Sequence, residues 1–140
     1  MVRISNLDVL KVLMKNSKTP FLEMARMLGV SETAIRKRIR KMEEEGVIRA
    51  YTVDVDPKKI GFEVNALIGL DTEPEVYLQV IEKLRSMDEI RSLYTSSGDH
   101  MIMMEIWFKN MDELSKFVDF LNSMNGVKKV CPAIIMEKIK

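Results

Sequence analysis

Five cationic side chains fall within six consecutive residues of the stretch SETAIRKRIRKMEEEG. They are Arg36, Lys37, Arg38, Arg40 and Lys41, and three glutamates follow almost directly. Clustered Lys and Arg attract polyanions, because each phosphate that they neutralise releases bound counterions. The chemistry that this stretch predicts is binding of a nucleic-acid backbone, not catalysis.

The spacing of apolar residues predicts a helix that carries these cations on one side. One narrow apolar stripe recurs at i, i+4 and i+7: Ile35, Ile39 and Met42. At about 100° per residue, the face opposite the stripe carries Thr33, Lys37 and Arg40. We expect these three to contact base edges, with Glu32 as a further candidate. The candidates for phosphate contacts are Ser31, Arg36 and Lys41. Arg38 lies nearer the buried edge, where a carboxylate partner is expected.

A second stretch with chemical potential is the loop TSSGDH at residues 95–100. Ser-Ser-Gly-Asp is also good material for a plain turn between two strands, so the pattern leaves both interpretations open. If the loop binds a ligand, the candidates are Ser97, Gly98, Asp99 and His100. An Asp99 carboxylate suits an ammonium group, either an α-amine or the cationic side chain of lysine or arginine. His100, the only histidine in the chain, is otherwise a structural residue, a dimer contact or a pH sensor.

Two further helices should precede the basic one. Ser5 or Asn6 can cap a first helix that ends near Asn16, with apolar residues at helical spacing: Leu7, Leu10, Leu13 and Met14. Thr19 and Pro20 resemble an N-cap and a first helical residue, which also makes Thr19 a candidate phosphate contact. The second helix would bury Leu22, Met24, Ala25 and Leu28, and Gly29 would end it. A tight turn then leads to Ser31, so the pattern predicts a helix-turn-helix whose recognition helix starts there.

The rest of the chain predicts a ferredoxin-like βαββαβ fold. VIEKLRSMDEIRSLY at 80–94 resembles FVDFLNSMNGVKKVC at 117–131, an offset of 37 residues, and each copy reads as helix, loop and strand. Strands at 62–70 and 101–108 precede the two copies, which gives the split βαβ order. The fold class is therefore α+β. Residues 48–56 alternate well enough to form a strand. The expected domains are a helix-turn-helix over 1–50, a linker strand and turn over 51–61, and a ferredoxin-like domain over 62–140.

Both faces of the predicted sheet are apolar. In MIMMEIWF, apolar residues at 102, 104, 106 and 108 alternate with Met101, Met103 and Trp107. Two helices can cover only one face, and the sheet of a second copy is the simplest cover for the other. A dimer would also supply two recognition helices for two half-sites.

Composition limits the remaining classes. Residues 1–50 hold 11 Lys and Arg against 6 Asp and Glu, whereas residues 51–140 hold 11 against 15, so a basic head precedes an acidic body. No apolar run approaches the roughly 20 residues of a membrane span, and the start lacks a secretory signal. One cysteine, Cys131, makes no internal disulfide, and neither it nor His100 has neighbours at metal-ligand spacing. We expect a cytoplasmic protein without a metal or cofactor.

The segments GVSETAIRKRIRKMEEEGVIRAY, DPKKIG and SSGDHMIM together resemble the Lrp/AsnC family, the feast/famine regulators, and the archaeal members with the same GDHM loop most of all. The resemblance runs through almost the whole chain. It implies a DNA-binding transcription regulator that dimerises, often stacks into octamers and binds an amino-acid effector between dimers. The loop departs from the common Gly-x-aromatic-Asp pattern, because Met101 takes the second carboxylate position.

Two other functions fit the same architecture. Sirohaem decarboxylases resemble these regulators, but such chemistry needs positioned acid–base groups, and the chain has one histidine. An amino-acid-binding regulatory subunit without DNA contact would not need the basic helix. The sequence favours the transcription regulator over both.

Overall fold

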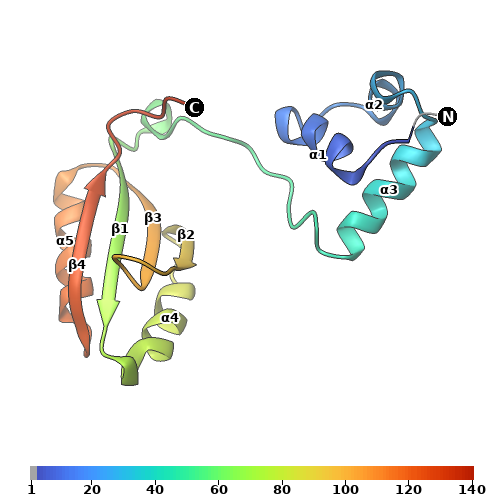
Figure 1. The fold of residues 1–140 in the computed structure, drawn as a ribbon. Coiled ribbons are helices and arrows are strands. Elements are labelled where there is room, and N and C mark those ends of the chain that lie inside the picture. Colours follow the sequence, from blue (N-terminus) through green and yellow to red (C-terminus); the bar gives the residue numbers. More distant parts are fainter. Residues whose placement is uncertain (1–2) are drawn as a thin grey trace. The chain divides into compact units, whose positions relative to one another are not determined.

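The computed structural model describes residues 3–140, which form two compact units. The first, called the head, ends at Asp54, and the second, called the body, begins at Val55. Figure 1 shows helices in the head and a sheet with helices in the body. No described helix combines the length and apolar character that a membrane crossing requires.

The first helix, α1, spans Asn6–Lys15, and Ser5 caps it, as the sequence predicts; the cap is a capping box completed by Asp8. The Ser5 hydroxyl accepts a hydrogen bond from the Asp8 amide at 3.2 Å, and the Asp8 carboxylate accepts one from the Ser5 amide at 2.7 Å. These two bonds satisfy amides that have no partner inside the helix. The cap therefore fixes where the head begins its first turn.

The second and third helices are α2, Phe21–Leu28, and α3, Glu32–Glu44. Gly29 ends α2 in the left-handed conformation with φ of 70°, and the Ser31 hydroxyl caps α3 by accepting from the Ala34 amide at 3.1 Å. Both features were expected. The proposed cap of α2 was wrong: Pro20 takes the N-cap position, and the Thr19 hydroxyl donates to the Asn16 carbonyl at 2.7 Å.

The head core confirms the stripe on α3 and corrects the one on α1. Its buried members are Val9, Leu13, Met24, Ala25, Ile35, Ile39 and Met42. Leu7 and Met14 were expected inside but are 54% and 72% exposed, and Leu22 on α2 is 51% exposed. Helix α1 has apolar residues on two sides, and only the side with Val9 and Leu13 packs against the other two helices.

The strand expected at 48–56 does not form. Residues 51–56 have no regular secondary structure, and Tyr51 and Val53 are exposed. A strand needs a neighbouring strand for its backbone groups, and the described sheet does not include this segment. The predicted turn is present as the 3₁₀ helix η1, Pro57–Ile60, followed by Gly61 with φ of 98°.

The body has the expected βαββαβ order. Its elements are β1 (Val64–Thr72), α4 (Tyr77–Arg85), β2 (Ile90–Thr95), β3 (Ile102–Phe108), α5 (Met111–Ser123) and β4 (Val127–Ile134), with a short 3₁₀ helix η2 (Pro74–Val76) before α4. The sheet order is β2-β3-β1-β4, and all neighbours are antiparallel. This is the ferredoxin-like arrangement.

The internal repeat corresponds to two equivalent structural units. Leu84 on α4 and Leu121 on α5 occupy matching positions, and both are fully buried. Ile90 and Val127 also match, and they begin β2 and β4. The same sequence pattern therefore builds each helix–strand pair around one shared core.

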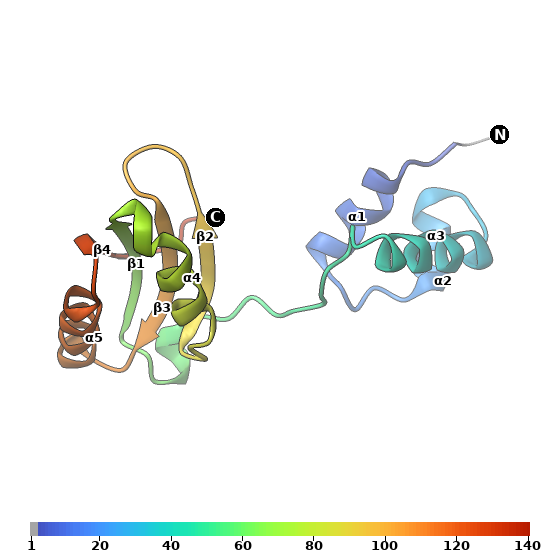
Figure 2. The same cartoon turned by 90° about the horizontal axis from the view of Figure 1, so that it is seen from below.

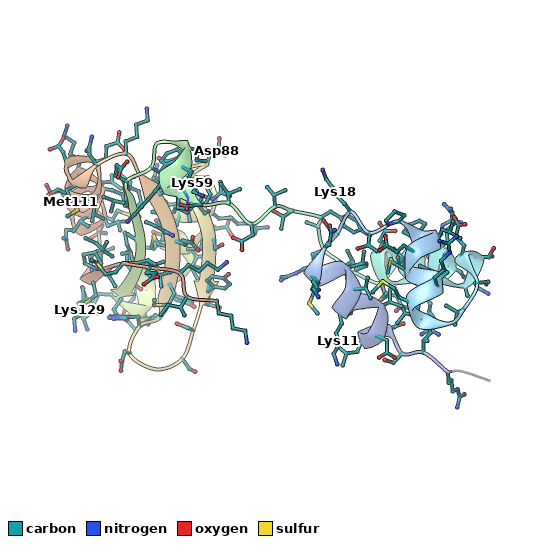
Figure 3. The ribbon with its side chains drawn as sticks, turned by 90° about the horizontal axis from the view of Figure 1, so that it is seen from above. Lys11, Lys18, Lys59, Asp88, Met111 and Lys129 are labelled. Atoms are coloured by element: carbon teal, nitrogen blue, oxygen red, sulfur yellow. The ribbon has the colours of Figure 1, made fainter. Side chains whose placement is uncertain are left out.

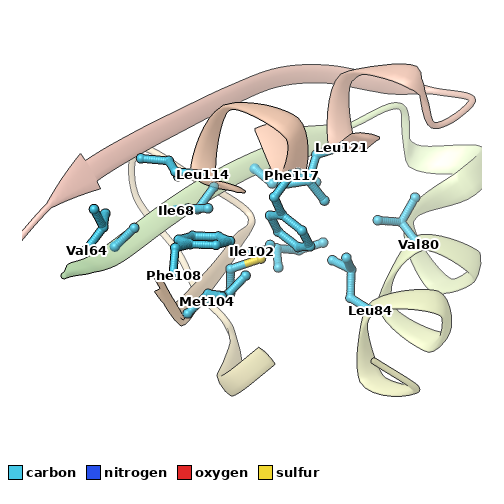
Figure 4. Close-up of a cluster of buried hydrophobic side chains, with 13 residues drawn as sticks. Val64, Ile68, Val80, Leu84, Ile102, Met104, Phe108, Leu114, Phe117 and Leu121 are labelled. Carbon is cyan, nitrogen blue, oxygen red and sulfur yellow. The ribbon is translucent and has the colours of Figure 1, made fainter. Parts of the chain in front are cut away.

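The two faces of the sheet differ in burial. On the helix-covered face, side chains such as Ile68, Met104 and Phe108 converge with residues of α4 and α5 (Figure 4). Residues that alternate with these along each strand lie on the opposite face, called the open face. They are Leu67, Gly69 and Asp71 of β1, and Met103, Glu105 and Trp107 of β3. Leu67 is 39% exposed although it lies on a central strand. The body alone leaves this apolar surface uncovered.

Candidate nucleic-acid interface and effector loop

The outward face of α3 carries three side chains with no partner among residues 3–140. Thr33, Lys37 and Arg40 are all exposed. The opposite stripe is buried, with Ile35 at 0% and Ile39 at 2% exposure. Within residues 3–140, no hydrogen bond or ion pair involves the side chains of these three residues. Their donors are free to meet an external ligand, with no internal interaction to break.

Two other predicted contacts on α3, Arg36 and Lys41, already have partners within the head. Arg36 pairs with Glu32 at 2.9 Å and lies over the Phe21 ring, 4.9 Å from its centroid. Lys41 lies 3.8 Å from the Glu45 carboxylate. These pairs are largely exposed, so each stabilises the head by at most about 1 kcal/mol. The cations of α3 therefore fall into two groups. Lys37 and Arg40 have no ion-pair partner among residues 3–140, whereas Arg36 and Lys41 are held by weak pairs within the head.

Arg38 is a structural residue of the head. Its guanidinium donates to the Asn6 side-chain carbonyl at 3.0 Å, so the expected carboxylate partner is an amide instead. The charge of Arg38 also acts on Asp8, whose pKa is held below its usual value by the hydrogen bonds from Ser5, with the charges of Lys11 and Arg38 acting in the same direction. Arg38 thus ties α3 to the start of α1.

The helix N-termini of the head add amide donors to its surface. Pro20 precedes α2 without a side-chain cap, so the first amides of α2 stay available, although the Thr19 hydroxyl is committed to Asn16. The Ser31 oxygen is committed to the Ala34 amide, which leaves its hydroxyl hydrogen to donate. Cations also lie outside α3: Lys18 extends outward from the head (Figure 3), and Lys11 is exposed.

The loop between β2 and β3 extends away from the strands (Figure 2). Ser97, Gly98 and Asp99 are exposed at its tip, and Gly98 has φ of 104°, a conformation that favours glycine. Ser96, which the sequence did not single out, closes the loop: its hydroxyl donates to the His100 carbonyl at 2.7 Å, and its amide donates to the Met101 carbonyl at 3.0 Å.

His100 points back onto the sheet, away from the loop tip. Its Nδ1 lies 2.9 Å from the Asp71 carboxylate, and the same carboxylate accepts the Met101 amide at 2.9 Å. The hydrogen bond from His100 holds the pKa of Asp71 below 3.8, the Met101 amide and the Lys129 charge act in the same direction, and burial opposes them. Sequence reasoning missed Asp71, whose only signal is a carboxylate at the end of the apolar run FEVNALIGL.

The remaining chemistry-bearing side chains form no metal site. No group of three or more His, Cys, Asp or Glu among the described residues could hold a metal ion. Cys131 is partly buried on β4, opposite Gly69. Trp107 lies under the Arg91 guanidinium, 3.8 Å from its ring centroid, and donates to Glu105 at 3.2 Å. These contacts order the open face without making a reaction centre.

Both units of the chain are similar to known protein domains. Residues 65–140 match the Lrp/AsnC ligand binding domain, and residues 3–49 match a winged helix-turn-helix DNA-binding domain. An HTH-type transcriptional regulator LrpA from Pyrococcus abyssi is 47% identical over 133 residues, which cover 94% of each chain.

Solved structures agree with these matches. The structure of Escherichia coli AsnC superposes with a TM-score of 0.81 at 28% identity, covering 99% of this chain and 95% of that one. A Neisseria meningitidis transcriptional regulator solved with L-methionine has the same fold, with a TM-score of 0.87 at 21% identity, covering 100% of this chain and 93% of that one. The family match spans more than half of the chain, and the LrpA relative covers nearly all of it. The chain belongs to the Lrp/AsnC family.

Proposed function

We propose that this protein is a transcription regulator that inserts α3 into the major groove of DNA. The observation that carries the proposal is the unpartnered set Thr33, Lys37 and Arg40, which faces away from the buried stripe of the same helix. An α-helix fits the major groove, and Arg and Lys read guanine there. Glu32 stands one turn before Arg36 and can accept from a cytosine amine when that pair opens.

The phosphate contacts in this proposal come from groups around that set. Arg36 and Lys41 belong to α3, Ser31 caps it, and Thr19 stands before the uncapped amides of α2. Phosphate contacts carry affinity without sequence preference. Lys41→Ala should weaken binding to all sequences alike and reduce the salt slope by about 0.9 per head. A salt titration with unchanged slope would remove Lys41 from the interface.

Dimerisation through the open face supplies the second head. Leu67, Met103 and Trp107 lie on this face, and both helices of the body cover the other one. Apolar patches of this kind on a central part of a sheet mark association surfaces. A second copy of the chain is the partner that covers this face, because a two-fold symmetric DNA site needs two heads. Dimers of this kind would stack further, with the octamer as the expected assembly.

The effector in this proposal is an amino acid held by the β2–β3 loop, at Ser97, Gly98, Asp99 and His100. The family match to a ligand-binding domain supports a small-molecule site in the body. The Neisseria relative was solved with L-methionine, whereas the exposed Asp99 here favours a cationic effector such as lysine or arginine. Calorimetry with each free amino acid tests this, and heat from acidic ones alone would refute the cationic choice.

Binding of the effector between dimers would change DNA affinity by shifting the balance between assemblies. A coupling of about 1–3 kcal/mol is typical, and it is reciprocal, so DNA must change effector affinity by the same factor. The enzyme and the DNA-free regulatory subunit are the competing functions. In a gel-shift assay at cytoplasmic salt concentrations, a regulator must retard DNA from the protein's own promoter region. The enzyme and the DNA-free subunit would not retard it.

A further inference from the structure

One carboxylate at the end of β1 anchors the whole C-terminal arm of the β2–β3 loop. Asp71 accepts the His100 Nδ1 hydrogen at 2.9 Å and the Met101 amide at 2.9 Å, so it holds both a side chain and the backbone next to it. Both side chains of the pair are mostly covered, with 18% of His100 and 21% of Asp71 exposed. The pair is therefore screened less by solvent than the exposed pairs of α3.

Gly69 gives the imidazole its place on the sheet. A Cβ added at residue 69 would overlap the ring of His100, with Cδ2, Cγ and Nε2 as its nearest atoms. Gly69 lies on β1 two residues before Asp71, on the same open face. The ring is therefore held from two directions, by the glycine backbone below it and by the Asp71 carboxylate at its Nδ1 edge.

The chemistry of the pair determines which ring nitrogen carries hydrogen. An ionised carboxylate only accepts hydrogen bonds, and the lowered pKa of Asp71 keeps it ionised. The hydrogen between the two groups must then sit on Nδ1. In the neutral imidazole, Nε2 becomes the acceptor.

We propose that Asp71 is the positioning residue of the effector loop, because it fixes His100 in the Nδ1–H tautomer and holds the Met101 backbone next to it. This proposal rests on the effector assignment given above. It adds Asp71 and Gly69 to a site that otherwise consists of loop residues.

The tautomer can be measured directly, because His100 is the only histidine in the chain. Imidazole ¹⁵N NMR of the full-length protein without ligand, at about pH 8 where ordinary histidine is neutral, should show Nδ1 protonated. Asp71→Asn replaces an acceptor with an amide that can donate, so the ring should change to the Nε2–H tautomer. Asp99→Asn, which alters a carboxylate on the same loop, should leave the tautomer unchanged. An Nε2–H signal in the wild type, or no change in Asp71→Asn, would overturn the proposal.

A second readout separates this proposal from the effector assignment. Calorimetry with free amino acids should show at least about a tenfold loss of affinity in Asp71→Asn for whichever amino acid binds the wild type, since a hydrogen bond to a charged group is lost or misdirected. Unchanged affinity would overturn the positioning role. If no amino acid binds the wild type, the effector assignment fails, and the NMR measurement still decides whether Asp71 sets the tautomer.

Discussion

Two arginines on α3 provide a matched test of the DNA-binding face. Arg40 is exposed and has no partner, whereas Arg38 donates to Asn6 and lies partly buried. The two residues are separated by about 200° around the helix. Substituting each with alanine removes the same charge from the same helix but from opposite sides of it.

The expected loss of DNA affinity in Arg40→Ala follows from the free guanidinium of Arg40. No internal pair has to break when it binds, so the whole bidentate contact, roughly 1–3 kcal/mol, appears as lost affinity per half-site. A dimer carries the substitution twice, which gives about 2–6 kcal/mol, or roughly 30-fold to 10⁴-fold in dissociation constant. The stability of the head should change little, because exposed surface substitutions stay within about 0.5 kcal/mol.

Arg38→Ala should behave in the opposite way. It removes the hydrogen bond to Asn6 at 3.0 Å, which should destabilise the head by about 0.5–1.5 kcal/mol. DNA affinity should stay within about threefold, because a charge on the far side of the helix is screened by salt. Fluorescence anisotropy on a selected operator gives affinity, and urea unfolding gives stability. If Arg38→Ala lost as much DNA affinity as Arg40→Ala, the assigned orientation of α3 would be wrong.

Three other outcomes concern the body. Leu67→Glu places a carboxylate opposite Glu105 on the open face and should give monomers in analytical ultracentrifugation. The control Leu78→Glu changes a helix position that is 73% exposed and should leave the assembly unchanged. Equal effects of the two substitutions would contradict the proposed interface. Because the pKa of Asp71 is lowered on folding, its contribution to stability is present above pH 3.8 and is lost as pH falls below that value, so unfolding of wild type and Asp71→Asn should differ in pH dependence in acid. Gly69→Ala should displace the His100 ring and cost about 1–3 kcal/mol, and adding His100→Ala should recover part of it in urea unfolding.

The sequence was sufficient for the elements that depend on local patterns. The α3 stripe, the Ser31 cap and the Gly29 turn follow from residue types at fixed spacing, and the structure has all three. The internal repeat likewise predicted the paired helix–strand units, because the same buried leucine recurs in each. The exposed positions of Lys37 and Arg40 on α3 also followed from helical periodicity alone.

Features that depend on tertiary contacts could not be predicted in this way. Helix α1 has apolar residues on two sides, so only packing against α2 and α3 decides that Leu13 is buried and Met14 exposed. The stretch at 48–56 alternates like a strand but has no strand beside it in the sheet. Asp71 and His100 are 29 residues apart, and no spacing rule connects them. Only the pairing of the non-consecutive strands β1 and β3 in the sheet creates that pair.

Paired α3 helices, in this proposal, read a two-fold symmetric DNA site through the face with Arg40. Selection of binding sites from random DNA, by the wild type and by Arg40→Ala, measures both the symmetry of the site and the role of Arg40. We expect an inverted repeat with half-site centres about one helical turn, or a multiple of it, apart, and relaxed preference at one base pair in each half-site for the variant. A site without symmetry, or identical sequences recovered by both proteins, would contradict it.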